Sequence, residues 1–576
     1  MGMIGKLLAR ALPRKPPTGD APTLRRLLDA AQAADREGRL EAACAAYRQA
    51  LDLAPDHPGV HVNFGALAKR MGDHASALAS FARAAALDPS LVHAWYNLGL
   101  LHYESWRLAD AEHALWQALS LASPGIDSKL LASIIGMQAL TLQSSGQPGK
   151  ARAFLDEAAD RFPDQADGCM RLGLLGLSAD PAVGADELLS RHRAWASRFA
   201  DPITAHAPHH EPDRLPHRLR IGYVSGDFCE HAVACFAEPI IEAHDRNRFE
   251  IFCYDNSPVA DGTTARLRRL ADHWRGITTL NDDAAAALVR RDRIDILVDL
   301  SGHTAHNRLS LFARKPAPLQ LTYLGYPATT GMRAFDYRVT DSIADPPPQA
   351  DTWYSESLLR LPRGQWCYRP PDTAIAAGAF PAAPGRISFA VFNRFDKITD
   401  DMIALWAGIL AATPQACLVI RGVPGTELRE HLSDRLARAG CMPERAALLG
   451  RVPQDQYWQS YHAADIALDT YPYNGVTTTC ESLWMGVPVV TLAGRFGASR
   501  CASSLLTTVG LPELVASSVE DYLRIAVDLA HDPARLRTLR HGMRERMRRS
   551  PLMDASGFTA AFEDALLHAW KSRTGT

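Results

Sequence analysis

The amino-acid sequence predicts an all-α repeat region followed by two α/β domains in tandem, and three observations support this fold class. The first third of the chain repeats with a period of 34 residues, a proline-rich segment follows near residue 210, and from Leu219 short β-rich runs alternate with helical stretches. The length of 576 residues leaves room for three or four domains of about 100–200 residues each.

Composition narrows the class of protein. The 62 Lys and Arg residues and 64 Asp and Glu residues give a formal charge of −2, so no overall field attracts nucleic acid or an anionic membrane. Hydrophobic and charged fractions of 47% and 22% are ordinary for a globular protein and exclude wholesale disorder. The ten cysteines form no CxxC pair, which indicates reduced thiols in the cytoplasm. No run approaches the ~18 apolar residues of a membrane span. Together with the near-neutral charge, this leads us to expect neither a membrane nor a nucleic acid as partner.

Residues 24–200 are predicted to form stacked helical pairs, preceded by a disordered leader at 1–23. A pattern of small, large and small residues recurs every 34 residues, with a looser fourth copy: Ala43, Tyr47 and Ala50; Ala77, Phe81 and Ala84; Ala111, Leu115 and Ala118; Ala151, Leu155 and Ala158. Small residues let two helices approach closely, and large ones fill the gap between them. The pattern resembles the tetratricopeptide repeat (TPR), a curved solenoid, so we expect a protein or peptide along its groove. Plain amphipathic helices that match by chance are the alternative.

Residues 201–218 are predicted to be a linker, because prolines and histidines crowd the segment. The chain then offers two series of strands, which define domains at 219–370 and 386–576 joined by a Pro/Ala/Gly-rich bridge at 371–385. Strands are expected at 219–225, 249–255, 294–300, 319–325, 336–341, 357–362, 386–392, 416–422, 445–450, 466–470 and 487–493. Strands that alternate with helices imply two parallel sheets, with a ligand in the cleft at their carboxyl ends.

Two common nucleotide-binding motifs are missing from this sequence. The segment after the first strand is GYVSGDF and contains no GxGxxG fingerprint, and no GxxxxGK[ST] sequence occurs anywhere. A nicotinamide-dependent enzyme and a P-loop ATPase are therefore both disfavoured.

The segment at 468–494, LDTYPYNGVTTTCESLWMGVPVVTLAG, carries the sharpest chemical signal. A strand ends at Asp469, a turn contains Asn474 and Gly475, and a helix begins near the threonines at 477–479. Amide groups at a helix start, with hydroxyls from Thr477, Thr478 and Thr479 beside them, suit a diphosphate. Glu481, in the first turn, has the chemistry to accept hydrogen bonds from a ribose. An ordinary Thr-capped helix is the alternative interpretation.

Two further clusters follow strands. Asn393, Arg394 and Lys397 come just after the strand at 386–392, where a cation would neutralise a diphosphate leaving group without a metal. His231 follows the first strand and His303 follows the third, where either would serve acid–base work or ligand binding. The alternatives are a surface lysine and solvated histidines. The HxxH spacing at 303–306 lacks a third ligand, so no metal site is predicted.

The motifs in order name a family. TPR-like repeats followed by GYVSGDF, SGHTAHN, RKPAPLQLTYLGYPATTG, FNRFDKI and LDTYPYNGVTTTCESLWMGVPVV resemble the protein O-glycosyltransferases, which include the nucleocytoplasmic O-GlcNAc transferases and the plant SPINDLY proteins. The resemblance covers about residues 24–570. It implies a GT-B fold of two Rossmann-like domains, metal-independent and inverting at the anomeric carbon, with the donor sugar nucleotide mainly on the second domain.

The resemblance also implies roles for individual residues. Lys397 matches the family's essential lysine, His231 an active-site histidine that contacts donor and acceptor, and Arg314 an active-site arginine. Thr477 and Thr478 match hydroxyls on the diphosphate, and Glu481 an acidic residue near the ribose. The remaining candidates for the nucleotide-sugar site are Asn393, Arg394, Val452, Pro453, Asn474, Gly475, Thr479, Gly331 and His303, of which Val452 and Pro453 match a segment that packs near uracil.

Four positions depart from the animal O-GlcNAc enzymes, which have glutamine at Arg394, lysine at Gln454, and histidine at both Tyr457 and Val476. Because these positions touch the donor, they leave its identity open. The segments around His303 and at 477–490 are more similar to SPINDLY proteins, some of which use GDP-fucose.

The function expected is transfer of GlcNAc from UDP-GlcNAc to Ser or Thr of polypeptides, with UDP as product and no cofactor. The alternatives are a SPINDLY-like O-fucosyltransferase that uses GDP-fucose, and a weakly active nucleotide-binding TPR scaffold. The sequence does not indicate an oligomeric state.

Overall fold

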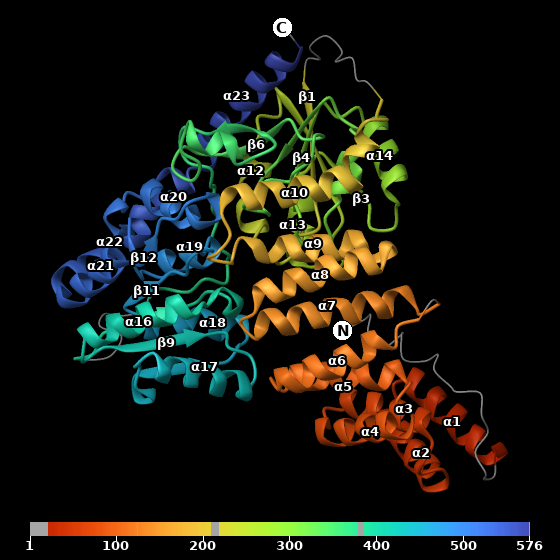
Figure 1. Cartoon of the computed structure of the whole chain (residues 1–576). Coiled ribbons are helices and arrows are strands. Elements are labelled where there is room, and N and C mark those ends of the chain that lie inside the picture. The colour runs from red at the N-terminus through yellow and green to blue at the C-terminus, as the bar shows by residue number, and fades with distance from the viewer. Residues whose placement is uncertain (1–20, 124, 209–217, 378–384, 575–576) are drawn as a thin grey trace. The chain divides into compact units, whose positions relative to one another are not determined.

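A computed structural model describes residues 21–123, 125–208, 218–377 and 385–574 (Figure 1). Most of the predicted leader, and parts of the predicted linker and bridge, therefore lie outside the described residues. The chain divides into two compact units, of which the first extends to Gly173 and the second begins at Leu174.

The first unit is a series of helical pairs, as the 34-residue period predicts. Its helices are α1 (Ala21–Arg36), α2 (Leu40–Leu53), α3 (Pro58–Arg70), α4 (His74–Leu87), α5 (Val92–Glu104), α6 (Leu108–Ser120), α7 (Ser128–Ser144), α8 (Pro148–Arg161) and most of α9 (Ala166–Leu177). The small repeat positions Ala43, Ala77 and Ala111 are fully buried between paired helices. Gly65 and Gly99, which lie 34 residues apart at the same repeat position, show why a small residue is needed there. A Cβ on Gly65 would lie 2.9 Å from the Phe81 ring, and one on Gly99 would lie 2.6 Å from Leu115 Cγ.

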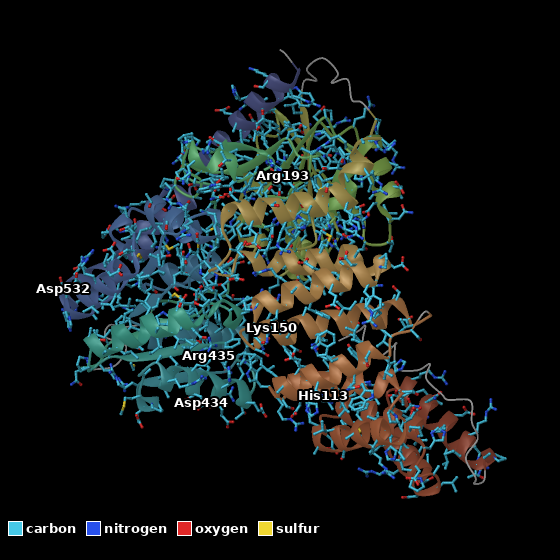
Figure 2. The ribbon with its side chains drawn as sticks, in the orientation of Figure 1. His113, Lys150, Arg193, Asp434, Arg435 and Asp532 are labelled. Carbon is cyan, nitrogen blue, oxygen red and sulfur yellow. The ribbon has the colours of Figure 1, made fainter. Side chains whose placement is uncertain are left out.

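The predicted repeat region is longer than the first unit. Helices α10 (Ala185–Phe199) and α11 (Asp201–Thr204) belong to the second unit, and α11 lies where a linker was predicted. His192 on α10 accepts or donates a hydrogen bond at 2.8 Å to the Tyr326 hydroxyl. The neighbouring Arg193, labelled in Figure 2, donates to Ser355 Oγ at 3.2 Å. Although α10 is helical like the repeats, it packs against a sheet domain rather than against another repeat.

The second unit contains two parallel sheets. The first has the order β3-β2-β1-β4-β5-β6-β7 and the second the order β10-β9-β8-β11-β12-β13, with all pairs parallel. The strands of the first lobe are β1 (Leu219–Ser225), β2 (Phe249–Asp255), β3 (His273–Gly276), β4 (Ile296–Asp299), β5 (Leu319–Thr322), β6 (Tyr337–Thr340) and β7 (Ser357–Arg360). Those of the second lobe are β8 (Ser388–Val391), β9 (Cys417–Arg421), β10 (Ala446–Leu449), β11 (Ile466–Leu468), β12 (Val489–Leu492) and β13 (Val515–Ala516).

Helices connect the strands in both lobes. In the first lobe they are α12 (Ala234–Ala243), α13 (Gly262–Leu270), α14 (Asp282–Arg291) and α15 (Leu309–Ala313). In the second they are α16 (Asp400–Ala412), α17 (Thr426–Arg438), α18 (Gln454–Ser460), α19 (Thr477–Trp484), α20 (Cys501–Thr508), α21 (Val519–His531) and α22 (Pro533–Arg549), followed by α23 (Ala555–Thr574). These alternations confirm the predicted fold class.

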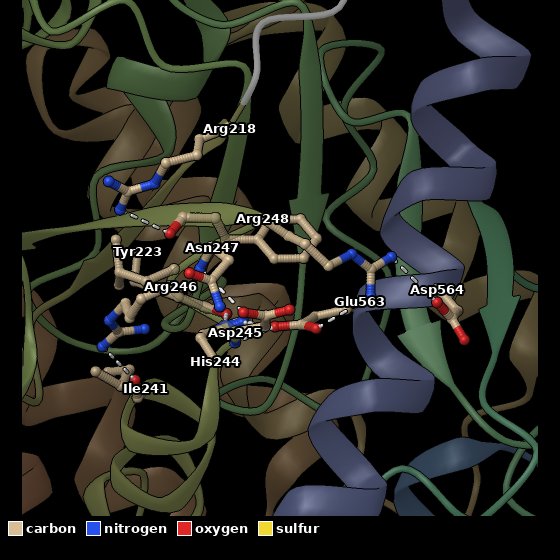
Figure 3. A network of polar contacts seen from close by, with 12 residues as sticks. Arg218, Tyr223, Ile241, His244, Asp245, Arg246, Asn247, Arg248, Glu563 and Asp564 are labelled. Atoms are coloured by element: carbon tan, nitrogen blue, oxygen red, sulfur yellow. Dashed lines mark hydrogen bonds and ion pairs between the residues drawn. The ribbon is translucent and has the colours of Figure 1, made fainter.

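The last helix, α23, belongs to the core of the first lobe although it follows the whole second lobe in sequence. Phe558, Phe562 and Trp570 are buried together with residues of β1, β2 and α12. In the same lobe His244 hydrogen bonds at 2.7 Å to the Tyr223 hydroxyl and at 2.8 Å to Glu563 of α23 (Figure 3). The last helix of the predicted second domain, 386–576, therefore packs in the core of the first lobe.

The structure contains no helix, in the part of the chain it describes, that is long and apolar enough to span a membrane.

Candidate active site

The sheet orders locate a ligand site in each lobe. In each sheet the strand order reverses beside the first strand, between β1 and β4 in the first lobe and between β8 and β11 in the second. Ligands of such sheets bind outside the carboxyl ends of the strands at this switch point. His231 and His303 follow β1 and β4, while Lys397 and the segment at 469–475 follow β8 and β11.

A buried carboxylate, Asp469, organises the switch point of the second lobe. Its Oδ1 atom accepts hydrogen bonds from Asn393 Nδ2 at 2.9 Å and from the Gly475 amide at 2.7 Å, and its Oδ2 atom accepts one from Thr491 at 2.7 Å. Burial raises the pKa of Asp469, while these bonds and the nearby Lys397 charge act in the opposite direction. The loops after β8 and β11 are thus both hydrogen bonded to the Asp469 carboxylate.

A glycine is required at position 475 because there is no space for a side chain, and not because of an unusual backbone angle. A Cβ atom there would lie 2.2 Å from Thr478 Oγ1, 2.9 Å from Asn393 Nδ2 and 3.1 Å from Asp469 Oδ1. No side chain fits, so the loop brings its backbone directly against the start of α19.

The first turn of α19 is open to a ligand. Its N-cap is Val476, which has no hydroxyl and makes no side-chain cap, so the predicted alternative of an ordinary Thr-capped helix does not hold. Thr477 and Thr478 are partly buried, and Thr479 is turned inward to donate to the Gly475 carbonyl at 2.8 Å. Helix-start amides without a cap, beside two threonine hydroxyls, suit an anion. The cavity lined by Asn393, Asp469 and Thr478 is only about 10 Å³, which is too small to enclose a nucleotide.

Lys397 lies beside this helix start. Its ammonium donates to the Asn474 carbonyl at 2.8 Å and lies 3.8 Å from the centroid of the Tyr473 ring. Burial lowers the pKa of Lys397 to about 8, although the neighbouring Asp469 acts to raise it. The group is a partly desolvated cation held by the loop that precedes α19.

Glu481, on the same helix, accepts hydrogen bonds from two tyrosines. The hydroxyls of Tyr457 and Tyr461 lie 2.7 and 3.1 Å from Glu481 Oε2, and Tyr461 stacks on Phe392 with ring centroids 3.9 Å apart. Burial raises the pKa of Glu481 to about 7, and the two hydroxyls limit that rise. Because Tyr457 lies on α18 and Tyr461 directly follows it, this network also holds the end of the segment that begins with Val452 and Pro453.

In the first lobe His231 lies beside an acidic residue, Asp227. Its side chain is 47% exposed, and its Nδ1 atom is 3.6 Å from Asp227 Oδ1. Burial raises the pKa of Asp227, whereas His231 and His306 act to lower it. The loops after β1 and β4 meet here, because a Cβ on Gly226 would lie 2.6 Å from atoms of His306.

Four predicted site residues are engaged elsewhere. Arg394 is 77% exposed and pairs with Asp396 at 2.6 Å. Arg314 ends α15, pairs with Asp283 and donates to the Ser310 carbonyl at 2.8 Å. His303 is 2% exposed, donates or accepts at 2.9 Å with the Thr330 carbonyl and packs on Trp195 of α10. Gly331 approaches the backbone of His192, and a Cβ there would clash at 2.4 Å. His303 of the SGHTAHN motif and Gly331 of the ATTG motif therefore both contact α10.

Sequence reasoning did not assign a role to Asp469 or Tyr461, and it named Tyr457 only as a donor-contacting position that departs from the animal enzymes. The available signal for Asp469 was a charged residue at the end of an apolar strand, a position that is costly unless it is satisfied or functional. The tyrosines carry no such signal, because only the folded structure brings their hydroxyls to Glu481 of α19. Among the described residues no three His, Cys, Asp or Glu side chains gather as metal ligands.

Two doubly wound sheets in tandem, with the polar loops of each at its switch point, form the architecture of the GT-B fold. The model of glycosyl transferase family 41 matches residues 201–367 and 378–562, and the chain belongs to this family. Tetratricopeptide repeat models match residues 24–57 and 62–125.

Relatives with assigned names support the same conclusion. The chain is 40% identical over 394 residues to a protein of Oryza sativa named probable UDP-N-acetylglucosamine–peptide N-acetylglucosaminyltransferase SPINDLY, covering 67% of this chain and 42% of that protein. It is 31% identical over 398 residues to the Arabidopsis thaliana SEC protein of the same activity name, covering 65% and 40%. The chain thus spans less than half the length of these curated relatives.

A solved structure matches nearly end to end. A mutant O-GlcNAc transferase of Thermobaculum terrenum is 38% identical, with a TM-score of 0.72, and the match covers 97% of this chain and 99% of that one.

Proposed function

We propose that this protein transfers GlcNAc from UDP-GlcNAc to Ser or Thr hydroxyls of polypeptides, with inversion at the anomeric carbon. The observation that carries the proposal is the Lys397 ammonium, held by the Asn474 carbonyl beside the uncapped start of α19. A diphosphate placed over α19 would meet the helix amides, the hydroxyls of Thr477 and Thr478, and this cation. The name of the Thermobaculum terrenum structure supports GlcNAc as the sugar.

The chemistry is one in-line displacement. The acceptor oxygen attacks C1 of the sugar and forms the new C–O bond, while the bond from C1 to the β-phosphate oxygen breaks and its electron pair stays on UDP. The hydroxyl proton leaves to a base. Charge builds up on the departing oxygen, where a fixed cation and helix amides stabilise it most. We therefore propose that the reaction needs no metal ion or other cofactor.

Lys397 is suited to this task by its surroundings. Burial lowers its pKa to about 8, so near neutral pH it is still charged, and its partial desolvation strengthens its interaction with the leaving group. We assign His231 to contact with donor and acceptor, supported by its exposed position at the switch point of the first lobe. We do not assign the base, because Asp227 and His231 lie together and both accept protons.

The repeat unit supplies the second part of the proposal. Stacked helical pairs of this kind usually hold extended polypeptide, so we infer that the acceptor is a protein or peptide. The ten free cysteines support a reducing compartment such as the cytoplasm.

The test is a pair of measurements on Lys397→Ala. We expect transfer from UDP-GlcNAc to fall about 10²–10³-fold, since that is the usual cost of removing one group that stabilises the transition state electrostatically. UDP binding, measured by calorimetry, should weaken in parallel. Lys150→Ala, an exposed lysine of α8 (Figure 2), serves as the control for UDP binding. Full transfer by Lys397→Ala would overturn the proposal.

A fucosyl donor is the second candidate, favoured by the greater similarity to SPINDLY than to SEC, 40% against 31% identity. Competition between UDP and GDP for the site decides between them. Tighter GDP binding together with transfer from GDP-fucose would show that the sugar is fucose and not GlcNAc. Nucleotide binding without transfer from either donor would show that the protein is a nucleotide-binding scaffold.

A further inference from the structure

Arg421 is a cation at the carboxyl edge of the second sheet that the mechanism does not use. It is the last residue of β9, which lies between β8 and β10. The register pairs it with Leu449 of β10, and the preceding residue, Ile420, pairs with Val391 of β8. Arg421 therefore lies level with Phe392, at the same edge as the loops that carry Lys397 and Val452.

Its guanidinium has no partner in the described part of the chain. The Nε atom is buried without a hydrogen bond, and no carboxylate among the described residues forms an ion pair with it. Arg445 of the same lobe, in contrast, donates to the Leu410, Thr413 and Ala416 carbonyls. Burial lowers the pKa of Arg421, as expected for an uncompensated charge. Leaving such a donor unsatisfied is costly, which points to a ligand that completes it.

The surroundings of Arg421 indicate which part of a ligand it meets. The Arg421 charge acts on the Tyr457 hydroxyl, and that hydroxyl donates to Glu481 at 2.7 Å. A positive group and an acidic group thus both act on Tyr457. Glu481 is the group we expect at the ribose, and Arg421 ends β9, which lies between β8 and β10.

The sheet order separates Arg421 from the diphosphate site. Strand β9 is two places from β11, the strand that precedes α19, so the two differ by about 10 Å at ~4.8 Å per strand. Lys397 and the first turn of α19 already supply the charge and the donors for two phosphates. The part of a sugar nucleotide that remains for Arg421 is the base.

We propose that Arg421 binds the carbonyl edge of the donor nucleobase and contributes to the choice of nucleotide. Uracil presents O2 and O4, and guanine presents O6 beside N7, so either base offers acceptors to a planar guanidinium. The inference rests on the proposed function, because it requires a nucleoside diphosphate in this site.

The test compares Arg421→Gln, Arg421→Lys and wild type by calorimetry with UDP, GDP and inorganic pyrophosphate. We expect Arg421→Gln to weaken binding of the preferred nucleoside diphosphate about 10–100-fold, the range for a lost charged hydrogen bond, while pyrophosphate affinity stays unchanged. The ratio of UDP to GDP affinity should move toward one. Arg421→Lys keeps the charge without the planar fork, so it should recover only part of the loss. Arg438→Gln, on the exposed face of α17, is the matched control.

Each outcome decides the question. An equal loss for pyrophosphate would make Arg421 a phosphate ligand and overturn the proposal, as would unchanged affinity for all three compounds. If wild type bound no nucleotide, this inference and the proposed function would both fail. If wild type bound nucleotide with the expected Arg421 effect but transferred no sugar, only the proposed function would fail. Arg421→Lys carries the test if Arg421→Gln does not fold, which a melting curve shows.

Discussion

Lys397 sets the pH range in which the protein binds a diphosphate most tightly. Burial lowers its pKa to about 8, so below pH 8 the free protein carries the charge that a diphosphate stabilises further. Above pH 8 the lysine is neutral and binding must take up a proton, so affinity for UDP should fall up to about tenfold per pH unit. Calorimetry between pH 7 and 10, in buffers of different ionisation enthalpy, measures both the decline and the proton uptake. Lys397→Met should remove the decline, and a wild-type affinity that is constant across this range would contradict the assignment.

Gly475 is the second residue whose change has a calculable effect. In Gly475→Ala the new methyl group meets Thr478 Oγ1 at 2.2 Å and Asn393 Nδ2 at 2.9 Å, so the loop or the start of α19 must move. We expect a loss of about 1–3 kcal/mol in the free energy of unfolding and a marked loss of UDP affinity. Gly542→Ala, in helix α22 with no atom within 4 Å of the added methyl, should be neutral or stabilising by up to about 1 kcal/mol. Urea unfolding and UDP titration of both variants test this, and similar results for the two would refute it.

At the residue scale the sequence predicted a cluster whose contacts only the structure shows. Lys397, Asn393 and Gly475 were predicted together because they follow apolar strands in polar clusters, and the structure joins them through Asp469 and Asn474. His303 looked similar, yet it serves the packing of α10. A residue after a strand can face either the ligand or a neighbouring helix, and only the tertiary partner decides which.

At the scale of elements, the repeat pairs depend on contact between glycine and a large residue sixteen positions later. Gly99→Ala should destabilise the first unit by about 1–2 kcal/mol, because its methyl group would lie 2.6 Å from the buried Leu115 Cγ. Gly168→Ala, on α9 with open space around the added methyl, is the control. Thermal unfolding followed by circular dichroism measures both, and UDP affinity should be unchanged in each. Greater stability of Gly99→Ala would show that Leu115 can shift.

Strand positions were predictable where most residues of the strand are apolar and buried. The predictions for β1 and β2 match to the residue, while β3, with the sequence His-Trp-Arg-Gly, and the two-residue β13 were missed. Both missed strands lie at an edge of a sheet, where one side of the strand stays open and an apolar run is not required. The boundary at residue 200 failed for a related reason, since α10 is helical like the repeats but is buried against a sheet lobe.

At the scale of the whole molecule, the first lobe depends on α23. Phe562→Ala should cost about 3–5 kcal/mol of that lobe's free energy of unfolding, because the ring is fully buried among residues of β1, β2 and α12. Asp564→Ala removes an exposed pair with Arg248 and should cost less than about 1 kcal/mol. Hydrogen exchange resolved by strand measures the effect, with faster exchange expected in β1, β2 and β4. Faster exchange confined to the second lobe would contradict this assignment of α23.

The place of α23 in the chain also sets the order of events during synthesis. The ribosome makes β1, β2 and α12 first, then the entire second lobe, and only afterwards the helix that buries Phe558, Phe562 and Trp570 against them. At roughly 5–20 residues per second that interval lasts tens of seconds, during which the first lobe carries an uncovered apolar face. The newborn chain therefore has a period in which chaperones and aggregation compete for that face. It ends only when α23 leaves the exit tunnel.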